Sequence, residues 1–489
     1  MKSPASTMGP RPLPLALRLV ALAALAAASS SCIRPVGPNH RAPDVAALVP
    51  AQWSWQPATP MDHVPKGAWW RLFDDPVLDD LQARALKASP GLHAALARVQ
   101  QARARARASA VEFFPDARFR SGFERQRTSG NLPTPIPVSI PPATFDGASI
   151  GFDLSYEIDL WGKVRRMVES SRAAAAATDA EFNNLSLSLS ADVAAQYFAT
   201  RSLDAEVSAL RVMLRLRGEA MDLAQQRLAA GLVTESVASR ARAERAAATA
   251  ALADATRARE ESAATLAFLC GETAGAVVLP ESPLDGRPPA LVPAGLPADL
   301  LERRPDIAAA ERLVASRNAE IGVAVAGYFP SVRLTGSGGQ LSRDIDSLFS
   351  ADSRTWSIGP SISLPLTGYA LTGARVRHAK AVREEAIAQY RQAVLGAFRD
   401  VETSLAQVRR RAEQAEALGQ ASAQAAAAAA LARQRLDAGI VSRTEWIEAE
   451  HARHDADLRR LQSIAMQHVA TVRLIKALGG GWDSTAARP

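Results

Sequence analysis

Two stretches of the chain alternate regularly between apolar and polar residues. In Ser149–Leu160 every even position is apolar and every odd position is polar or Gly. In Arg354–Leu366 the even positions from Trp356 onward are again apolar or Pro, and the odd ones are mostly Ser and Thr. Such alternation predicts strands with one apolar and one polar face. A weaker strand precedes each, over Ala117–Arg125 and Val332–Leu341, so we expect two β-hairpins.

These strands suit two environments. One layer of a soluble sandwich is the commoner setting for alternating strands. However, the chain has only these two hairpins, and strands of about ten residues have the length of a tilted strand that crosses a membrane. Four strands cannot close a barrel, because about eight is the practical minimum. If the strands span a membrane, several copies must share one barrel, and three copies with twelve strands are the smallest ring above that minimum.

Much of the remaining chain has a helical period. No proline occurs between Gly162 and Gly231, and apolar residues recur in steps of four and three from Leu203 to Leu228, with Arg217 as an interruption. This spacing predicts a coiled-coil helix of roughly 100 Å at about 1.5 Å per residue. Helices over Pro76–Glu112 and from Thr234 to about Cys270 are each roughly half as long. Two half-length helices end to end would match the long one.

The pattern then repeats. Residues 226–234 read QRLAAGLVT and residues 434–442 read QRLDAGIVS, and a Phe-Pro pair precedes each hairpin. Each half therefore reads as helix, hairpin, long helix, tight Gly turn and returning helix, which predicts a two-fold internal repeat. The chain divides into a signal peptide (1–31), an extended N-terminal segment (32–75), a first repeat (76–278, hairpin 115–160, turn 231–234), a linker or equatorial segment (279–300), a second repeat (301–482, hairpin 330–366, turn 439–442) and a tail (483–489).

The N-terminus predicts export and lipidation. Residues 1–31 have a basic start and the apolar run Leu19–Ala28, which is too short to cross a bilayer and is typical of a signal peptide. Cys32 follows three serines in a setting similar to a bacterial lipobox, whose cysteine is acylated and becomes the mature N-terminus. An ordinary signal peptide with an incidental cysteine is the alternative. Ile33 stands where an inner-membrane retention signal would have Asp, so we favour the outer membrane.

Composition and charge exclude several classes of protein. Two cysteines cannot form a disulfide framework, and once Cys32 is lipidated Cys270 is expected to be a buried, inert thiol. The net charge of +7 suggests nucleic acid, but the arginines are dispersed along helices without interleaved aromatic residues, so no nucleic-acid partner is expected. The seven histidines are scattered, and no catalytic or metal-binding motif is present. We therefore expect neither an enzyme nor a cofactor nor a metal site.

Several motifs in a fixed order resemble those of the outer-membrane efflux protein family, in particular its lipoprotein branch that serves resistance-nodulation-division (RND) pumps. They span nearly the whole mature chain: Val36–Asn39 with Pro43, Trp69–Pro76 with Leu78 and Leu81, Ala97–Arg103, Tyr156–Arg166, Leu300–Ile307 and Ala477–Trp482. The resemblance implies a homotrimer in which a twelve-stranded barrel continues into a long α-helical tunnel with an equatorial belt. It implies partners in a periplasmic adaptor, an inner-membrane RND transporter and outer-membrane lipid.

The implied function is a passive exit duct for drugs, metals or other small solutes. Through the resemblance, the two Gly turns become tips that face the adaptor, namely Gly231, Leu232, Val233 and Thr234 together with Gly439, Ile440, Val441 and Ser442. Simple helix caps are the alternative, although they do not explain the repeated apolar pair. The same architecture in a type I protein secretion system is the alternative function, and neighbouring genes would discriminate the two.

Charged residues beside the two tips are candidates for the constriction that closes the tunnel. They are Arg227, Arg435, Asp437, Arg443 and Glu445. Ion pairs between helices at this end would hold the pore shut. A solvated coiled-coil surface is the alternative for each of them.

Overall fold

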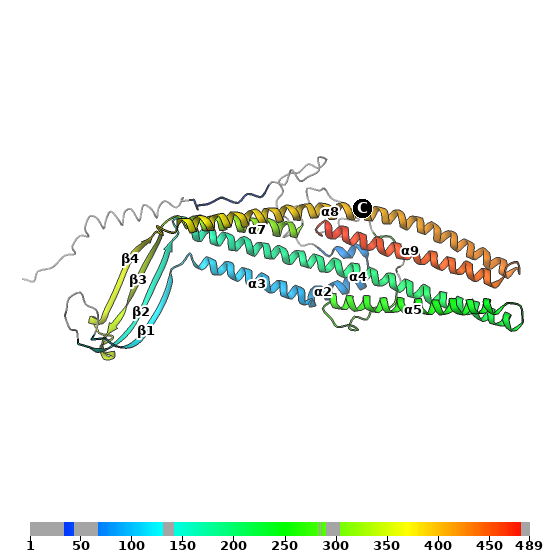
Figure 1. Cartoon of the computed structure of the whole chain (residues 1–489), viewed down its shortest axis with the longest axis horizontal. Helices are drawn as coiled ribbons and strands as arrows, with labels where there is room; N and C mark the ends of the chain where they lie inside the picture. The colour runs from blue at the N-terminus through cyan, green and yellow to red at the C-terminus, as the bar shows by residue number, and fades with distance from the viewer. Residues whose placement is uncertain are drawn as a thin grey trace, which may run out of the picture. The chain divides into compact units, whose positions relative to one another are not determined.

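The computed structural model describes residues 34–43, 67–130, 141–282, 284, 286–289 and 304–480 (Figure 1). The first half runs through η2 (Trp69–Phe73), α2 (Pro76–Ala88), α3 (Pro90–Val111), β1 (Asp116–Arg127), β2 (Thr144–Ile158), α4 (Lys163–Ala229) and α5 (Glu235–Leu269). The second half runs through α7 (Pro305–Ala326), β3 (Ser331–Ser342), η3 (Ile345–Ser347), η4 (Ala351–Ser353), β4 (Arg354–Ser363), α8 (Tyr369–Asp437) and α9 (Arg443–Ala477). This order confirms a mostly helical fold with four strands and two similar halves.

The long helices match between the halves. α4 has 67 residues and α8 has 69, while α5 and α9 have 35 each. The prediction that a returning helix has half the length of the long one is therefore confirmed. The repeat is visible in the lengths of its elements as well as in its turns.

The expected helix over Pro76–Glu112 is wrong, because the structure has two helices there. α2 ends at Ala88, Ser89 is extended with ψ 117°, and α3 starts at Pro90. Proline has no backbone N–H, and it disfavours helical geometry in the residue before it. The break follows from Pro90 alone.

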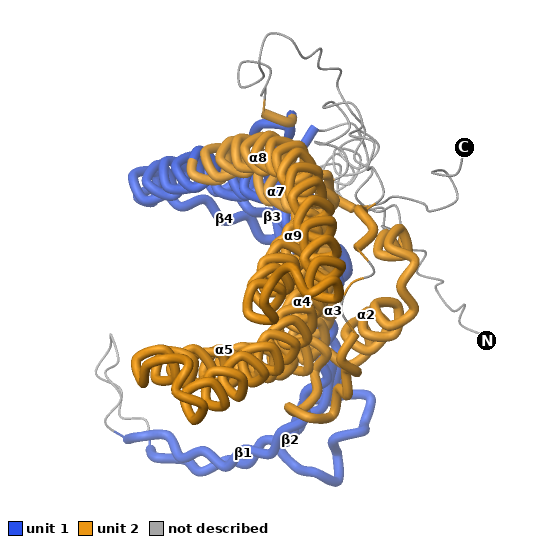
Figure 2. The backbone as a smooth tube through the Cα atoms, turned by 90° about the vertical axis from the view of Figure 1, so that its right-hand side faces the viewer, with its two compact units in different colours: residues 1–41, 104–172, 315–384 blue, residues 42–103, 173–314, 385–489 orange. Residues whose placement is uncertain are grey.

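The chain forms two compact units (Figure 2). The described parts of the first unit come from residues 1–41, 104–172 and 315–384 and contain the sheet with its flanking helix ends. The described parts of the second unit come from residues 42–103, 173–314 and 385–489 and contain α2, α5, α9 and both Gly turns. The boundaries fall inside α3, α4, α7 and α8.

The sheet of the first unit has four antiparallel strands in the order β1-β2-β3-β4, with α4, α5 and α7 between β2 and β3 in the chain. Gly151 of β2 faces Gly339 of β3 in the register. A Cβ on Gly339 would lie 2.2 Å from the carbonyl oxygen of Ile150, so a side chain there would force the two strands apart. Glycine in a strand allows this close approach of backbones.

The second unit has its largest core where η2, α2, α4 and α5 meet. Trp69, Leu78, Phe198 and Leu266 are all buried there. The Cys270 thiol joins this core, as predicted, and burial raises its pKa to about 11.

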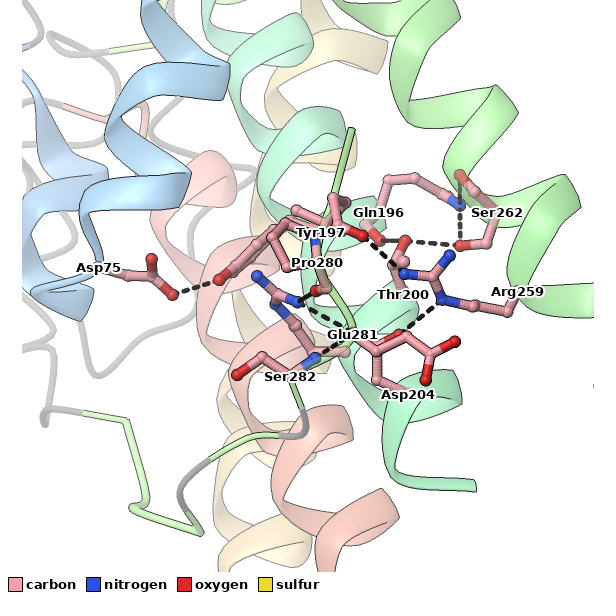
Figure 3. A network of polar contacts seen from close by, with 12 residues as sticks. Asp75, Gln196, Tyr197, Thr200, Asp204, Arg259, Ser262, Pro280, Glu281 and Ser282 are labelled. Carbon is pink, nitrogen blue, oxygen red and sulfur yellow. Dashed lines mark hydrogen bonds and ion pairs between the residues drawn. The ribbon is translucent and has the colours of Figure 1, made fainter. Parts of the chain in front are cut away.

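A buried polar network fixes the start of the linker to this core (Figure 3). The Asp204 carboxylate is fully buried and accepts hydrogen bonds from Arg201 (3.0 Å) and Arg259 (2.7 Å). The same two guanidinium groups donate to the carbonyl oxygens of Pro280 (2.6 Å) and Leu279 (2.7 Å). Because buried charges need such partners, the network holds residues 279–280 against α4 and α5.

Asp75 extends the polar contacts to α2. Its carboxylate caps α2 by accepting from the amides of Val77 and Leu78, and it also accepts from the Tyr197 hydroxyl. Burial, together with this bond, raises the pKa of Tyr197 to about 12. None of the helices in the described part of the chain is long and apolar enough to cross a membrane.

Candidate functional site

The two repeated turns have the same backbone geometry. In the first tip (Gly231–Thr234) the Gly231 amide donates to the Leu228 carbonyl (2.9 Å) and the Leu232 amide to the Arg227 carbonyl (2.8 Å). This pair of bonds is the Schellman motif, which ends a helix with a residue of positive φ. Gly231 has φ +70°, a conformation that glycine adopts without strain.

The second tip (Gly439–Ser442) repeats this arrangement. The Gly439 amide donates to Leu436 (2.9 Å) and the Ile440 amide to Arg435 (2.8 Å), and Gly439 has φ +74°. A Cβ on either glycine would meet no atom within 4 Å. Glycine is therefore required for its backbone conformation and not for space.

Each tip exposes one large aliphatic side chain. Leu232 is 74% exposed and Ile440 is 73% exposed, whereas Val233 and Val441 are half-buried. The residue at this position of a Schellman motif frequently packs back onto its own helix. Here both side chains face outward, so each tip presents an apolar contact to its surroundings.

The caps of the returning helices differ between the tips. Ser442 accepts a hydrogen bond from the Glu445 amide (3.2 Å) at the start of α9. Thr234 stands at the same place before α5, but its side chain makes no cap bond. The hydroxyl caps the returning helix in the second tip only.

Within the described residues, no ion pair joins any two of the five predicted constriction residues. Arg443 pairs with Glu219 of α4 (2.8 Å), and Asp437 pairs with Arg433 one turn earlier (3.3 Å). Arg227 and Arg435 contribute their carbonyl oxygens to the tips, and Glu445 contributes its amide to the Ser442 cap.

Arg217 makes the inter-helix contact that sequence reasoning missed. Its guanidinium lies 3.0 Å from the Glu244 carboxylate of α5 and 2.8 Å from the Glu448 carboxylate of α9. The interruption of the apolar seam in α4 is therefore a link between three helices. The charge of Arg217 at a seam position was the available signal for such a contact. Its partners could not be identified from the sequence, because they are 27 and 231 residues away.

The sheet of the first unit has two chemically distinct faces. One face is apolar, and its large side chains are exposed: Phe119 (56%), Phe152 (65%), Trp356 (77%), Ile358 (70%) and Ile362 (72%). Phe119 and Phe152 face each other across β1 and β2 with ring centroids 5.3 Å apart. An exposed apolar surface of this kind marks a site of contact with another protein or a membrane.

The opposite face is polar and contains ion pairs. Arg120 pairs with Asp153. The Glu157 carboxylate forms ion pairs with both Arg333 (3.5 Å) and Lys163 (3.0 Å). Hydroxyls of Ser337 and Ser357 lie 2.9 Å apart on the same face. The predicted alternation is thus observed as one apolar and one charged surface.

The remaining predicted site residue, Cys32, lies outside the described residues. Within the described residues, no cluster of three or more His, Cys, Asp or Glu side chains has the geometry to hold a metal ion.

The comparisons with known proteins agree with one another. The family described as "Outer membrane efflux protein" matches residues 81–272 and 296–480. The chain is 29% identical to the antibiotic efflux pump outer membrane protein ArpC of Pseudomonas putida, over 91% of this chain and 92% of that protein. It is 31% identical to the pyoverdine export outer membrane protein OpmQ of Pseudomonas aeruginosa, over 90% of this chain and 93% of that protein.

Solved structures show the same fold. The outer-membrane channel OprN matches with a TM-score of 0.79 at 30% identity, covering 92% of this chain and all of that chain. The outer membrane protein VceC of Vibrio cholerae matches with a TM-score of 0.74 at 26% identity, covering 87% of this chain and all of that chain. The two matched segments, the duplicated turns and the shared fold establish that this chain belongs to the outer membrane efflux protein family.

Proposed function

We propose that this chain is the outer-membrane channel subunit of a tripartite RND-type efflux pump. It serves as a passive exit duct through which drugs or other small solutes cross the periplasm and the outer membrane. The energy comes from the inner-membrane transporter, and this chain contributes a conduit, an anchor and a docking surface. Relatives named for antibiotic efflux and pyoverdine export support small solutes as the cargo.

The two-faced sheet carries this proposal. Within the described residues β1 and β4 each pair with a strand on one side only, so both edges offer free backbone groups. In a membrane every backbone N–H and C=O must be satisfied, which requires a closed barrel. Four strands are too few to close one, and a homotrimer supplies twelve. The apolar face then contacts lipid and the polar face lines the lumen.

The tips are the proposed adaptor-docking surface. Leu232 and Ile440 are the exposed apolar side chains that a periplasmic adaptor would bury, while the glycines set the turn that presents them. Ion pairs at this end, including Arg443–Glu219 and Arg217–Glu448, tie α9 to α4. In our proposal, contacts of this kind keep the tunnel closed until the adaptor binds.

We propose Cys32 as the acylation site, with the chain in the outer membrane and its tunnel in the periplasm. Incorporation of radioactive palmitate in cells should depend on Cys32 and should be absent from Cys32→Ala. Label that persists in this variant would overturn acylation at Cys32.

Purified mature protein tests the channel itself. We expect a detergent-solubilised trimer that conducts ions in planar bilayers. A monodisperse monomer that stays soluble without detergent would contradict the proposal. Crosslinkers at residues 233 and 441 should capture the adaptor in cells, whereas crosslinkers at the exposed positions 98 and 107 of α3 serve as controls.

A further inference from the structure

A buried arginine near the start of α4 holds the N-terminal segment of the first unit. Arg166 is only 3% exposed. Its Nε donates to the Val36 carbonyl (3.2 Å), and its Nη2 faces the carbonyls of Pro35 (3.5 Å) and Gly37 (3.3 Å) and the Asn39 side-chain oxygen (2.7 Å). Its Nη1 donates to Glu169 (2.8 Å). Most of the fork of donors is thus directed at residues 35–39.

Further contacts hold the same segment from both sides. The Val36 amide donates to the Trp161 carbonyl (3.0 Å), and the Asn318 side-chain amide of α7 donates to the Pro38 carbonyl (2.8 Å). Residues 35–38 are therefore bonded to the end of the first hairpin, to α4 and to α7.

Glycines make this contact possible. A Cβ on Gly162 (φ +77°) would lie 2.5 Å from Pro35, and a Cβ on Gly37 (φ +89°) would lie 2.5 Å from Gly322. A Cβ on Gly322 would meet both the Arg166 side chain (2.7 Å) and the Val36 carbonyl (2.8 Å). The segment fits only because none of these residues has a side chain.

The arginine and the segment depend on each other. A buried guanidinium must have its donors satisfied, and here the acceptors are chiefly backbone carbonyls of residues 35–37. Lysine would not replace it, because one ammonium group lacks the planar fork that reaches several acceptors.

We propose that Arg166 is a positioning residue that locks the lipid anchor to the junction between β2 and α4. This inference rests on the proposed acylation of Cys32. The three residue-to-residue steps from Cys32 to Pro35 span at most about 11 Å. Pro35 packs on Gly162, directly before α4. The acyl chains therefore enter the membrane beside the end of the apolar sheet face, and the anchor and the sheet move together.

Hydrogen exchange of the Val36 amide tests the clamp on the full-length trimer. Arg166→Ala should accelerate this exchange at least tenfold, and Gly322→Ala should do the same while it keeps the arginine. The matched controls are Arg172→Ala, an exposed arginine of the same helix, and Gly396→Ala, a helical glycine whose added Cβ meets nothing within 4 Å. Unchanged exchange in Arg166→Ala and Gly322→Ala, or equal acceleration in the controls, would overturn the clamp.

A nitroxide at position 34 tests the consequence for the anchor. In Arg34→Cys the introduced thiol is the reactive one, because Cys270 is buried and Cys32 carries the lipid. We expect an immobilised spectrum that becomes mobile when Arg166→Ala is added, with palmitate still bound. A mobile label in the parent protein would refute the inference. Absence of palmitate from a protein with a protected Val36 amide would instead refute acylation and leave the clamp intact.

Discussion

The two tips share one backbone and differ in how they are tied to the rest of the second unit. Both have Schellman bonds of 2.8 and 2.9 Å, a glycine of positive φ and one exposed aliphatic residue. The second tip adds the Ser442 cap, the Arg443–Glu219 pair and Arg433, which lies over the Trp446 ring at 5.2 Å. The first tip has instead a local pair within α5, between Arg242 and Glu235.

This difference separates two roles of the repeat. The duplicated residues determine the shape of each turn, because φ and the two Schellman bonds depend on Gly and the backbone. The residues that differ determine which helices are joined. α4 is connected to α9 through Arg217–Glu448 and Arg443–Glu219, and to α5 through Arg217–Glu244.

The largest expected effect tests whether the two tips are equivalent in docking. Leu232→Asp and Ile440→Asp should each weaken adaptor binding by roughly 10- to 150-fold, since burial of a Leu or Ile side chain contributes about 1.5–3 kcal/mol. Titration of purified adaptor against solubilised trimer measures this, with Leu96→Asp, an exposed leucine of α3, as control. Equal affinity for all variants would exclude the tips as the docking surface.

The two turns should lose the same stability when their glycines are replaced by alanine. Gly231→Ala and Gly439→Ala should each cost about 1 kcal/mol, because both place a Cβ at positive φ in otherwise open space. Hydrogen exchange at the ends of α4 and α8 reports the loss. A cost confined to one tip would show that the backbones are not equivalent in solution.

Substitutions of the two cap residues should affect the two tips differently. Ser442→Ala should destabilise the first turn of α9 by about 1 kcal/mol, while Thr234→Ala should change α5 much less, because the Thr234 side chain makes no cap bond. Amide exchange in the first turn of each helix is the measurement. The reverse order would contradict the asymmetry.

The ion pair between Arg443 and Glu219 should contribute less. Both side chains are about half exposed, so a double-mutant cycle with alanine should give a coupling of roughly 0.2–1 kcal/mol that decreases in high salt. The same cycle on Arg227 and Glu219, which form no ion pair in the described protomer, is the control. Equal coupling in both cycles would mean that general charge, and not this contact, is being measured.

The smallest effect is a pH dependence at the first tip. Hydrogen bonds from Arg242 and Ser239 hold the pKa of Glu235 below its ordinary value near 4.5. Because the pKa of Glu235 is lowered, its ionised carboxylate stabilises the start of α5 at neutral pH. This stabilisation is lost as the pH falls through the pKa of Glu235. The protection factors of the amides at the start of α5 should fall more in the parent than in Arg242→Ala between pH 5 and about pH 3. Identical acid profiles would disprove the local pair.

The alternation of apolar and polar residues was sufficient to predict the strands whose two faces have different surroundings. The strands from Ser149 and from Arg354 alternate because their two faces meet different surroundings, and the structure has strands at both places. The break at Ser89–Pro90 was missed, although a proline inside a helical pattern is a direct signal for it.

Contacts between distant helices could not be predicted in the same way. Arg217 was visible as an interruption, but its pairing with Glu448 depends on the rotation of α4 and α9 about their axes. Heptad spacing predicts which residues form the apolar seam, but it does not predict which residues pair with the charged positions beside the seam. The Arg166 contacts depend likewise on the path of residues 35–39, which have neither helical nor strand periodicity.

The matched lengths of the repeats limit which insertions and deletions the tunnel helices can accept. One residue added to α8 between positions 385 and 437 would move its tip by about 1.5 Å and turn it by about 100°. Ile440 would then point away from the direction that Leu232 keeps. Seven residues would advance the tip by about 10 Å with a rotation of only about 20°. Length variants that retain function should therefore change in steps near seven residues, in both repeats at once.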